Sequence, residues 1–198
     1  TDAPGRSRAP GNTVDGAGTE EGDGELNFDT DNENALWRIA ERAWSSRLAA
    51  EQWVVHNLAG ADGNGAPLIE VPEGFVRAPD LLATKGAQNV YWEVKFRTAP
   101  TINRDTGEKE HWMDRAKVYD YARVRDATGY QVFVVLYDAS ARRGEGQWYE
   151  IPVEKLTACG RPEVRRAADL DPVDAWVWPL VEMTPVQGPR VDVPVQDQ

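Results

Sequence analysis

The chain has few of the residues that build disulfides and zinc sites, and it has no long apolar run. Among 198 residues there is one cysteine, Cys159, and there are two histidines, His56 and His111. A single thiol excludes an intramolecular disulfide, and two histidines without a cysteine cluster do not form a zinc site. No apolar run approaches the ~20 residues that cross a bilayer, and the polar, Gly-rich start does not resemble a signal peptide. We therefore expect a cytoplasmic protein without membrane contacts.

Motifs for nucleotide hydrolysis and serine chemistry are also missing. The sequence has no Gly-x-x-x-x-Gly-Lys-Ser/Thr loop and no serine nucleophile elbow. The net charge of −11 argues against binding nucleic acid by bulk attraction. Residues 1–34 hold nine acidic and two basic residues, so about −7 of that charge lies in this segment. The remainder is only mildly acidic and can carry a local basic cleft.

Composition divides the chain into three parts. Residues 1–33 are rich in Gly, Asp and Glu and poor in apolar residues, which predicts a disordered acidic tail. Residues 34–178 have the alternating apolar pattern of a folded domain. Proline recurs from Pro179 onward, so we expect residues 179–198 to form a Pro-rich extended tail.

The hydrophobic pattern of the middle part predicts an α/β domain. We expect a first helix at 34–57, capped by Asp31 or Asn32, and a second helix at 110–127 that ends at Gly129. Expected strands lie at 68–71, 75–77, 81–83, 90–96, 130–138 and 148–152, with a flexible loop at 59–66, a short helix or turn at 153–156 and partly helical structure in 161–178. This order predicts an αβββαβ core in which helices flank a small mixed sheet.

Two short stretches of the predicted hairpin carry most of the chemistry. Asp80 precedes one strand, and the next strand alternates with period two, so that Tyr91, Glu93 and Lys95 share one face. A polar turn at 84–89 joins the strands, and the hairpin can bring Asp80 beside Glu93. Two carboxylates and an ammonium group would then converge. Carboxylate oxygens suit Mg²⁺ or Mn²⁺, and a lysine can neutralise charge on a phosphoryl group.

The run from Pro79 to Gly86, followed by Glu93-Val94-Lys95, resembles the PD-(D/E)XK nuclease superfamily, the fold of restriction endonucleases and Holliday-junction resolvases. It looks most like the archaeal resolvase branch in its Ala-Thr-Lys-Gly turn and in the spacing of the two acids. The detailed likeness covers about twenty residues, and the element order extends it over 34–156. A chain with this triplet alone carries a turn residue and a solvated edge strand more often than a nuclease site.

The resemblance implies a restriction-endonuclease-like fold and a defined ligand set. Asp80, Glu93 and the carbonyl of Val94 would bind the metal, and Lys95 would position the attacking hydroxide and stabilise the phosphate. The helix residue Glu41, followed by Arg42 and by Leu48, matches the spacing of a helix glutamate that completes the site in the resembled resolvases. The alternatives for this ligand are Glu51 and Glu33, and the structural alternative for Glu41 is an ion pair with Arg38 or Arg42.

Candidates for contacting substrate phosphates lie on the second helix and after the catalytic strand. Related nucleases place Lys, Gln or Tyr on this helix, which implies Lys117 first and Tyr121 second, with Arg97 as a loop cation. The competing interpretation is an amphipathic helix with a solvated charged stripe and a solvated arginine. His111 is a candidate general base that this chemistry does not require.

These observations predict a Mg²⁺- or Mn²⁺-dependent deoxyribonuclease. The alternative is a catalytically inactive nuclease-fold domain that binds nucleic acid or protein, and RNA is the alternative substrate. The acidic N-terminal tail suggests a surface for a protein partner. Resolvases are dimers, so a homodimer is a further expectation from the resemblance.

Overall fold

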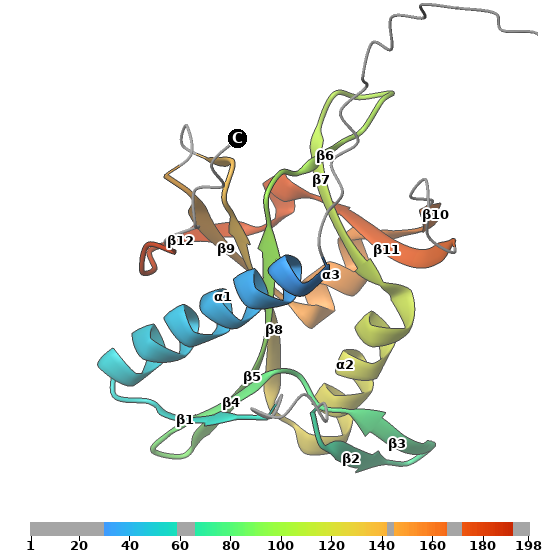
Figure 1. Ribbon diagram of the computed structural model, residues 1–198. Coiled ribbons are helices and arrows are strands. Elements are labelled where there is room, and N and C mark those ends of the chain that lie inside the picture. The colour runs from blue at the N-terminus through green and yellow to red at the C-terminus, as the bar shows by residue number, and fades with distance from the viewer. Residues whose placement is uncertain (1–29, 59–65, 142–144, 166–171, 192–198) are drawn as a thin grey trace, which may run out of the picture.

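The computed structural model describes residues 30–58, 66–141, 145–165 and 172–191, with side chains from residue 35 onward (Figure 1). Residues 1–29 of the predicted tail and residues 59–65 of the predicted loop lie outside these ranges. The elements are α1 (Thr30–Ala50), β1 (Val54–Asn57), β2 (Leu68–Val71), β3 (Gly74–Arg77), β4 (Leu81–Lys85), β5 (Gln88–Arg97), β6 (Thr101–Ile102), β7 (Lys109–Asp114), α2 (Arg115–Thr128), β8 (Gln131–Asp138), β9 (Gln147–Pro152), α3 (Val153–Cys159), β10 (Arg161–Arg165), β11 (Val173–Pro179), the 3-10 helix η2 (Leu180–Glu182) and β12 (Thr184–Val186).

The main sheet has six strands in the order β1-β4-β5-β8-β9-β12. Only β5 and β8 pair in parallel, and α2 lies between them in the sequence. The remaining neighbours are antiparallel. The elements α1, β1, β4, β5, α2 and β8 therefore form the predicted αβββαβ core within a mixed sheet.

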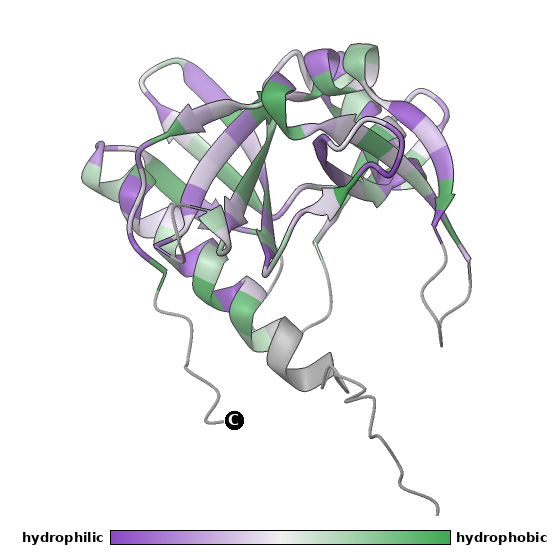
Figure 2. Cartoon of the chain, turned by 90° about the horizontal axis from the view of Figure 1, so that it is seen from above, coloured by the Kyte–Doolittle hydropathy of each residue, from purple (hydrophilic) through white to green (hydrophobic). Residues whose placement is uncertain are grey.

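Helices cover both faces of this sheet, with α1 on one face and α2 and α3 on the other (Figure 1). The hydrophobic bands of α1 alternate with hydrophilic bands, as expected for a helix with one buried stripe (Figure 2). Because successive strand residues point to opposite faces, β5 serves both layers. Tyr91 packs with the α2 layer, and Trp92, Val94 and Phe96 pack with the α1 layer, as the alternation predicts.

The first helix is shorter at its C-terminal end than the sequence predicts. It ends at Ala50, and residues 54–57, predicted to be helical, form β1, the first strand of the core. Gln52 adopts φ +69°, with Gln52 N donating to Ala49 O at 2.9 Å and Trp53 N donating to Leu48 O at 3.0 Å. These two bonds are those of a Schellman motif. The motif usually has glycine at the left-handed position, so a glutamine there conceals the helix end in the sequence.

The start of the first helix also differs from the prediction. The helix begins at Thr30, so Asp31 and Asn32 lie within its first turn, and neither of them is the predicted N-cap.

The second helix begins five residues later than predicted. Residues 109–114 form β7, and α2 starts at Arg115 because Asp114 is its N-cap, with the Asp114 carboxylate accepting from Ala116 N at 2.8 Å. The predicted end is confirmed, since Gly129 takes φ +71° and its N–H donates to Arg125 O. The strands β8 and β9 form the predicted hairpin, and α3 follows directly.

The C-terminal third contains strands that the sequence does not predict. Residues 161–178, expected to be partly helical, form β10 and β11, which join β7 and β6 in a second, four-stranded sheet. The segment 179–198, expected to be a tail, contributes η2 and also β12, which pairs with β9 in the main sheet. Within it, Val191 is 3% exposed. The residues of β10 are mostly polar, so the sequence has no alternating hydrophobic pattern there that would predict a strand.

Within the described ranges, no helix is long and apolar enough to cross a membrane.

The packing of α1 on the sheet depends on Trp44. This side chain is fully buried and lies against Trp92 and Trp148, with ring centroids 5.3 and 5.0 Å away. We expect Trp44→Ala to lower the free energy of unfolding by about 3–5 kcal/mol, because it removes a buried aromatic ring and leaves a cavity. Trp37→Ala, on the same helix but 38% exposed, should cost less than about 1 kcal/mol. Urea denaturation followed by far-UV circular dichroism measures both, and equal losses would contradict the assigned packing.

Candidate active site

The β4–β5 hairpin brings the two predicted acids to the same place. Its two-residue turn begins at Gly86, which has φ +61°, the first position of a type II′ turn. Leu81 pairs with Trp92, so one step further along the register Asp80 lies opposite Glu93. The Asp80 carboxylate accepts a hydrogen bond from Val94 N at 2.8 Å, and Leu58 N donates to Asp80 O at 2.7 Å. The turn and these bonds hold Asp80 at the middle of β5.

Glu93 is the most enclosed charged group of the site, with 1% of its surface exposed. Lys95 Nζ contacts Glu93 Oε1, and Lys117 Nζ from α2 lies 3.9 Å from the same oxygen. Tyr121, one turn further along α2, also acts to lower the pKa of Glu93 through its hydroxyl. Burial raises the pKa of Glu93, but Lys95 and Lys117 outweigh this and hold the pKa below its ordinary value. The carboxylate is therefore ionised at neutral pH.

The environment raises the pKa of both Asp80 and Lys95, which favours the neutral form of Asp80 and the charged form of Lys95. Burial, followed by repulsion from Glu93, raises the pKa of Asp80 well above its ordinary value, and Glu41 adds to the rise. Burial lowers the pKa of Lys95, but attraction to Glu93 and Asp80 outweighs burial and raises it overall. Lys95 is therefore a charged ammonium group. The positive charge near Asp80 does not offset burial and the repulsion from neighbouring carboxylates.

The structure distinguishes between Glu41 and Glu51, the two described candidates on the first helix. Burial raises the pKa of Glu41, followed by repulsion from Glu93, and Lys95 acts in the opposite sense, so Glu41 lies within electrostatic reach of the site. Glu51 forms an ion pair with Arg47 at 3.0 Å, and its carbonyl accepts from Lys85, at the far end of β4 from Asp80. The side chain of Glu33 is not among those described.

No three His, Cys, Asp or Glu side chains are grouped closely enough to hold a metal ion by themselves in the described ranges. The donors that do converge are hard oxygens: the carboxylates of Asp80 and Glu93, with Glu41 in electrostatic reach. Burial, followed by repulsion among these carboxylates, raises the pKa of Asp80 and Glu41, and a bound divalent cation relieves that repulsion. In donor chemistry the residues therefore fit Mg²⁺ or Mn²⁺.

The predicted phosphate contacts fall into three different environments. Lys117 is about half exposed at the rim of the site. Tyr121 is 3% exposed and points into the core, where nucleic acid does not reach it. Arg97 donates to the carbonyls of Phe96 and Trp112, both at 3.2 Å, and its guanidinium lies 5.4 Å from the Trp112 ring centroid. Arg97 therefore links β5 to β7 and is not a solvated loop cation.

His111 is buried and lies outside the carboxylate group. It is 2% exposed on β7, and burial lowers its pKa to about 4, although Asp138 acts in the opposite sense. Its Nε2 and the Asp138 Oδ2 are both buried without a hydrogen-bond partner. A neutral, enclosed imidazole of this kind does not serve as a solvent-exposed base at neutral pH.

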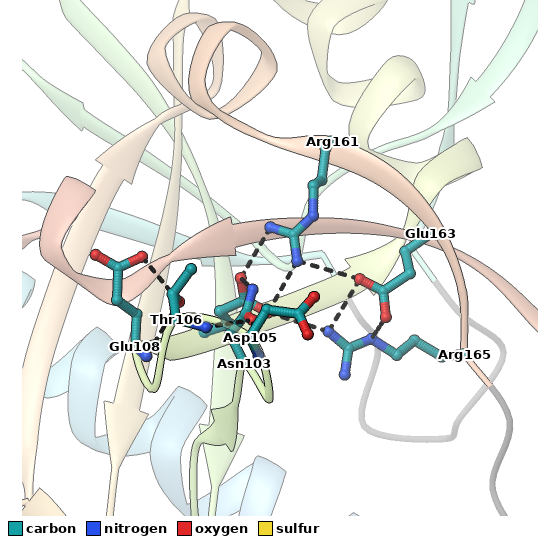
Figure 3. A network of polar contacts seen from close by, with 8 residues as sticks. Asn103, Asp105, Thr106, Glu108, Arg161, Glu163 and Arg165 are labelled. Carbon is teal, nitrogen blue, oxygen red and sulfur yellow. Dashed lines mark hydrogen bonds and ion pairs between the residues drawn. The ribbon is translucent and has the colours of Figure 1, made fainter.

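A second buried acid, Glu110, is not among the predicted site residues, because the sequence pattern predicts a helix at residue 110. Glu110 is 1% exposed, and Arg161 Nη1 lies 2.8 Å from its Oε1. Arg165 and Asn103 also contact it. Figure 3 shows the two arginines converging with Glu163 beside the turn of the β6–β7 hairpin. These contacts bind the hairpin to β10, so the arginine charges are already balanced by carboxylates.

The raised pKa of Asp80 predicts a stability change with a definite sign. The folded state holds the Asp80 proton more tightly than the unfolded state, so the ionised group destabilises the fold as pH rises through its folded pKa. Asp80→Asn removes this charge, and Asn can still accept from Val94 N. In metal-free buffer with EDTA we expect Asp80→Asn to unfold at higher urea than wild type at pH 8, with a gain that disappears below about pH 4.

The matched control is Asp105→Asn, an exposed side chain on the β6–β7 turn, which should leave stability unchanged. A loss of stability in Asp80→Asn at pH 8 would show that the ionised carboxylate contributes favourably to the metal-free fold.

Comparisons with known proteins find similarity among solved structures. No protein-family model and no curated protein matches the chain. Among solved structures, the Hjc Holliday junction resolvase of Archaeoglobus fulgidus, an archaeal hyperthermophile, is similar, with a TM-score of 0.46, 16% identity, and coverage of 76% of this chain and 91% of that one. D212, a nuclease from a fusselovirus, has a TM-score of 0.41 and 10% identity over 77% of this chain and 84% of its own. By the order and pairing of its core elements, the chain has a restriction-endonuclease-like fold.

Proposed function

We propose that this chain is a metal-dependent nuclease that hydrolyses phosphodiester bonds of DNA. The observation that carries the proposal is the convergence of Asp80, Glu93 and Lys95 on one hairpin. Burying these groups is costly, because the sheet must enclose an ionised carboxylate, an ammonium group and a second carboxyl whose pKa is raised. Packing alone does not account for that cost. The same three groups suit the stabilisation of charge on a phosphate.

Asp80 and Glu93 would hold Mg²⁺ or Mn²⁺, with the Val94 carbonyl as a further oxygen donor and Glu41 as the helix ligand. A divalent cation at this point supplies Lewis-acid stabilisation of negative charge on the scissile phosphate. It also offsets the repulsion that raises the pKa of Asp80.

Lys95 is the residue that acts on the reacting phosphate. Its ammonium group is ion-paired with Glu93 and remains charged at neutral pH. Placed beside the phosphate, it stabilises the charge that builds on the equatorial oxygens when water attacks phosphorus and the P–O bond to the leaving oxygen breaks. Lys117, half exposed at the rim, contributes a second cation for substrate binding.

The acidic balance of the chain sets how substrate binds. With a net charge of −11, DNA is held by the local cations of the site, so binding weakens steeply with salt. RNA is the alternative substrate, and a homodimer and a protein partner for the acidic N-terminal segment belong to the same proposal.

A nuclease-fold domain that binds without cleaving is the second candidate. The observation in its favour is that Glu93 already has Lys95, Lys117 and Tyr121 as partners, while no three acidic or metal-binding side chains group together in the described ranges. Under that reading the lysines neutralise Glu93 permanently and no cation is needed.

A cleavage panel separates the two candidates. Wild type is incubated with Mg²⁺, Mn²⁺ or EDTA and with linear, circular, branched and single-stranded DNA, and with RNA. We expect metal-dependent cleavage of at least one DNA substrate. Asp80→Asn and Lys95→Ala should each reduce the rate roughly 100-fold or more, because each removes charge stabilisation at the phosphate.

Glu51→Gln is the matched control and should cleave at the wild-type rate, since Glu51 lies away from Asp80. Circular dichroism confirms that each variant is folded. Binding of DNA without cleavage under every condition would favour the second candidate, and equal activity of all variants would place the activity elsewhere.

Glu41 provides a separate test of the metal site. If its carboxylate helps to hold the cation, Glu41→Gln should raise the Mg²⁺ concentration for half-maximal cleavage by about 10-fold, the usual range for a residue that supports a metal site. Glu51→Gln should leave the titration unchanged. The opposite ranking of the two variants would assign the helix ligand to Glu51.

A further inference from the structure

The C-terminal residues 184–191 lie along the β8–β9 hairpin, although the sequence predicts a tail there. Residues 184–186 pair with β9 as β12, and the Gln147 side-chain amide of the hairpin donates to Val186 O at 2.8 Å. We call residues 184–191 the C-terminal strap. Its first part is therefore a strand of the main sheet with an additional side-chain bond.

Beyond β12, two aromatic side chains of the hairpin hold the strap. Trp148 Nε1 donates to Pro189 O at 2.7 Å. The Tyr137 hydroxyl lies 3.2 Å from Glu145 O, at the hairpin turn, and 3.5 Å from Val191 O, in the strap. Side-chain donors thus satisfy main-chain carbonyls of the strap after its ladder with β9 has ended.

The strap approaches the Trp148 ring closely at Gly188. A Cβ added at Gly188 would lie 2.4 Å from Trp148 Cδ1 and 2.7 Å from Trp148 Nε1. The ring has little freedom to move away, because it is 2% exposed and its centroid lies 5.0 Å from the rings of both Trp44 and Tyr137. The docked position of the strap therefore requires glycine at residue 188.

The same Trp148 ring supports the first helix. Trp44 is the fully buried residue of α1 that packs on Trp148. Trp148 therefore contacts the strap through its pyrrole edge and α1 through its ring system. A buried indole N–H without an acceptor is costly. If the strap leaves, we expect the Trp148 ring to shift toward water and away from Trp44.

The strap is covered on one side only. Gln187, Gly188 and Arg190 are exposed, and an open cleft of about 720 Å³ lies between the strap and the β8–β9 hairpin. A terminal segment that is held beyond its strand by a few side-chain bonds opens at a lower free energy than the central strands of a sheet. The strap can therefore leave its position without unfolding of the domain.

We propose that the C-terminal strap is a latch for α1. In the docked state it fixes the Trp148 ring against Trp44, and in the released state the packing of α1 on the main sheet loosens. Glu41 lies on α1, one turn before Trp44, so the latch would also govern the position of the helix ligand. Only this last consequence rests on the proposed function.

The test releases the strap in the full chain with Gly188→Val. Brief trypsin treatment, followed by mass spectrometry, measures cleavage after Arg190, and hydrogen–deuterium exchange measures the opening of each helix. We expect cleavage after Arg190 to be about 10-fold faster than in wild type, because trypsin cuts the open state. Amides of α1 between residues 36 and 50 should exchange about 10-fold faster, while those of α2 stay unchanged.

The matched control is Gln187→Val, which places the same side chain at the neighbouring exposed position and should alter neither measurement. Trp148→Phe is a second variant that retains an aromatic ring against Trp44 and removes the donor to Pro189 O. It should release the strap in the same way, with a smaller effect on α1. Circular dichroism verifies that all variants are folded.

Two results would overturn the latch. One is faster cleavage after Arg190 with unchanged exchange of α1, which would show that the strap leaves without loosening the helix. The other is unchanged cleavage in Gly188→Val, which would show that the strap stays docked despite the added side chain. If wild type cleaves DNA, Gly188→Val should require more Mg²⁺, as Glu41→Gln should. Absence of cleavage in wild type would overturn the proposed function and leave the exchange test of the latch intact.

Discussion

The ion pair between Lys95 and Glu93 is the interaction on which the arrangement of the site depends. Glu93 carries a charge in the interior of the main sheet, with 1% of its surface exposed. An isolated buried carboxylate is costly, so its ionisation requires positive partners and hydrogen-bond donors nearby. Lys95, Lys117 and Tyr121 provide them from β5 and α2. Once Glu93 is held ionised in this way, its field contributes to raising the pKa of Asp80, Glu41 and Lys95.

That field explains why neighbouring carboxyls behave differently. Glu93 has two lysines beside it and a lowered pKa, whereas Asp80 has a neighbouring carboxylate, a single backbone donor at Val94 and a raised pKa. Glu41 belongs to α1, and burial, followed by repulsion from Glu93, raises its pKa as well. The site therefore stores electrostatic repulsion in the folded state, as functional sites often do at a cost in stability. A divalent cation would relieve that repulsion.

The strands outside the αβββαβ core support the site without taking part in it. Arg97 lies two residues beyond Lys95 and joins β5 to β7 through the carbonyl of Trp112. Near the start of β7, Glu110 is held by Arg161 and Arg165 of β10. Figure 3 shows these two arginines beside the turn of the β6–β7 hairpin. Because β7 leads directly into α2, these contacts help to fix where α2 begins and thus where Lys117 and Tyr121 meet Glu93.

Local pattern in the sequence determined the hairpin, its alternation and the character of the site. The period-two order of 90–96 assigns Tyr91, Glu93 and Lys95 to one face, and a strand's geometry allows no other division. The parallel pairing of β5 and β8, the packing of α1 against Trp92 and the electrostatic effect of Glu41 on Asp80 arise between segments that are distant in the sequence. So do the end of α1 at a left-handed Gln52 and the pairing of β7, β10 and β12 within their sheets. In β10 the polar residues are held by the strand ladder and by ion pairs of Glu163 with Arg161 and Arg165. The sequence therefore names the chemical groups, because side-chain chemistry and strand period are local. Only the tertiary structure decides which group is buried, which is paired and which faces solvent, because burial and charge depend on neighbours far along the chain.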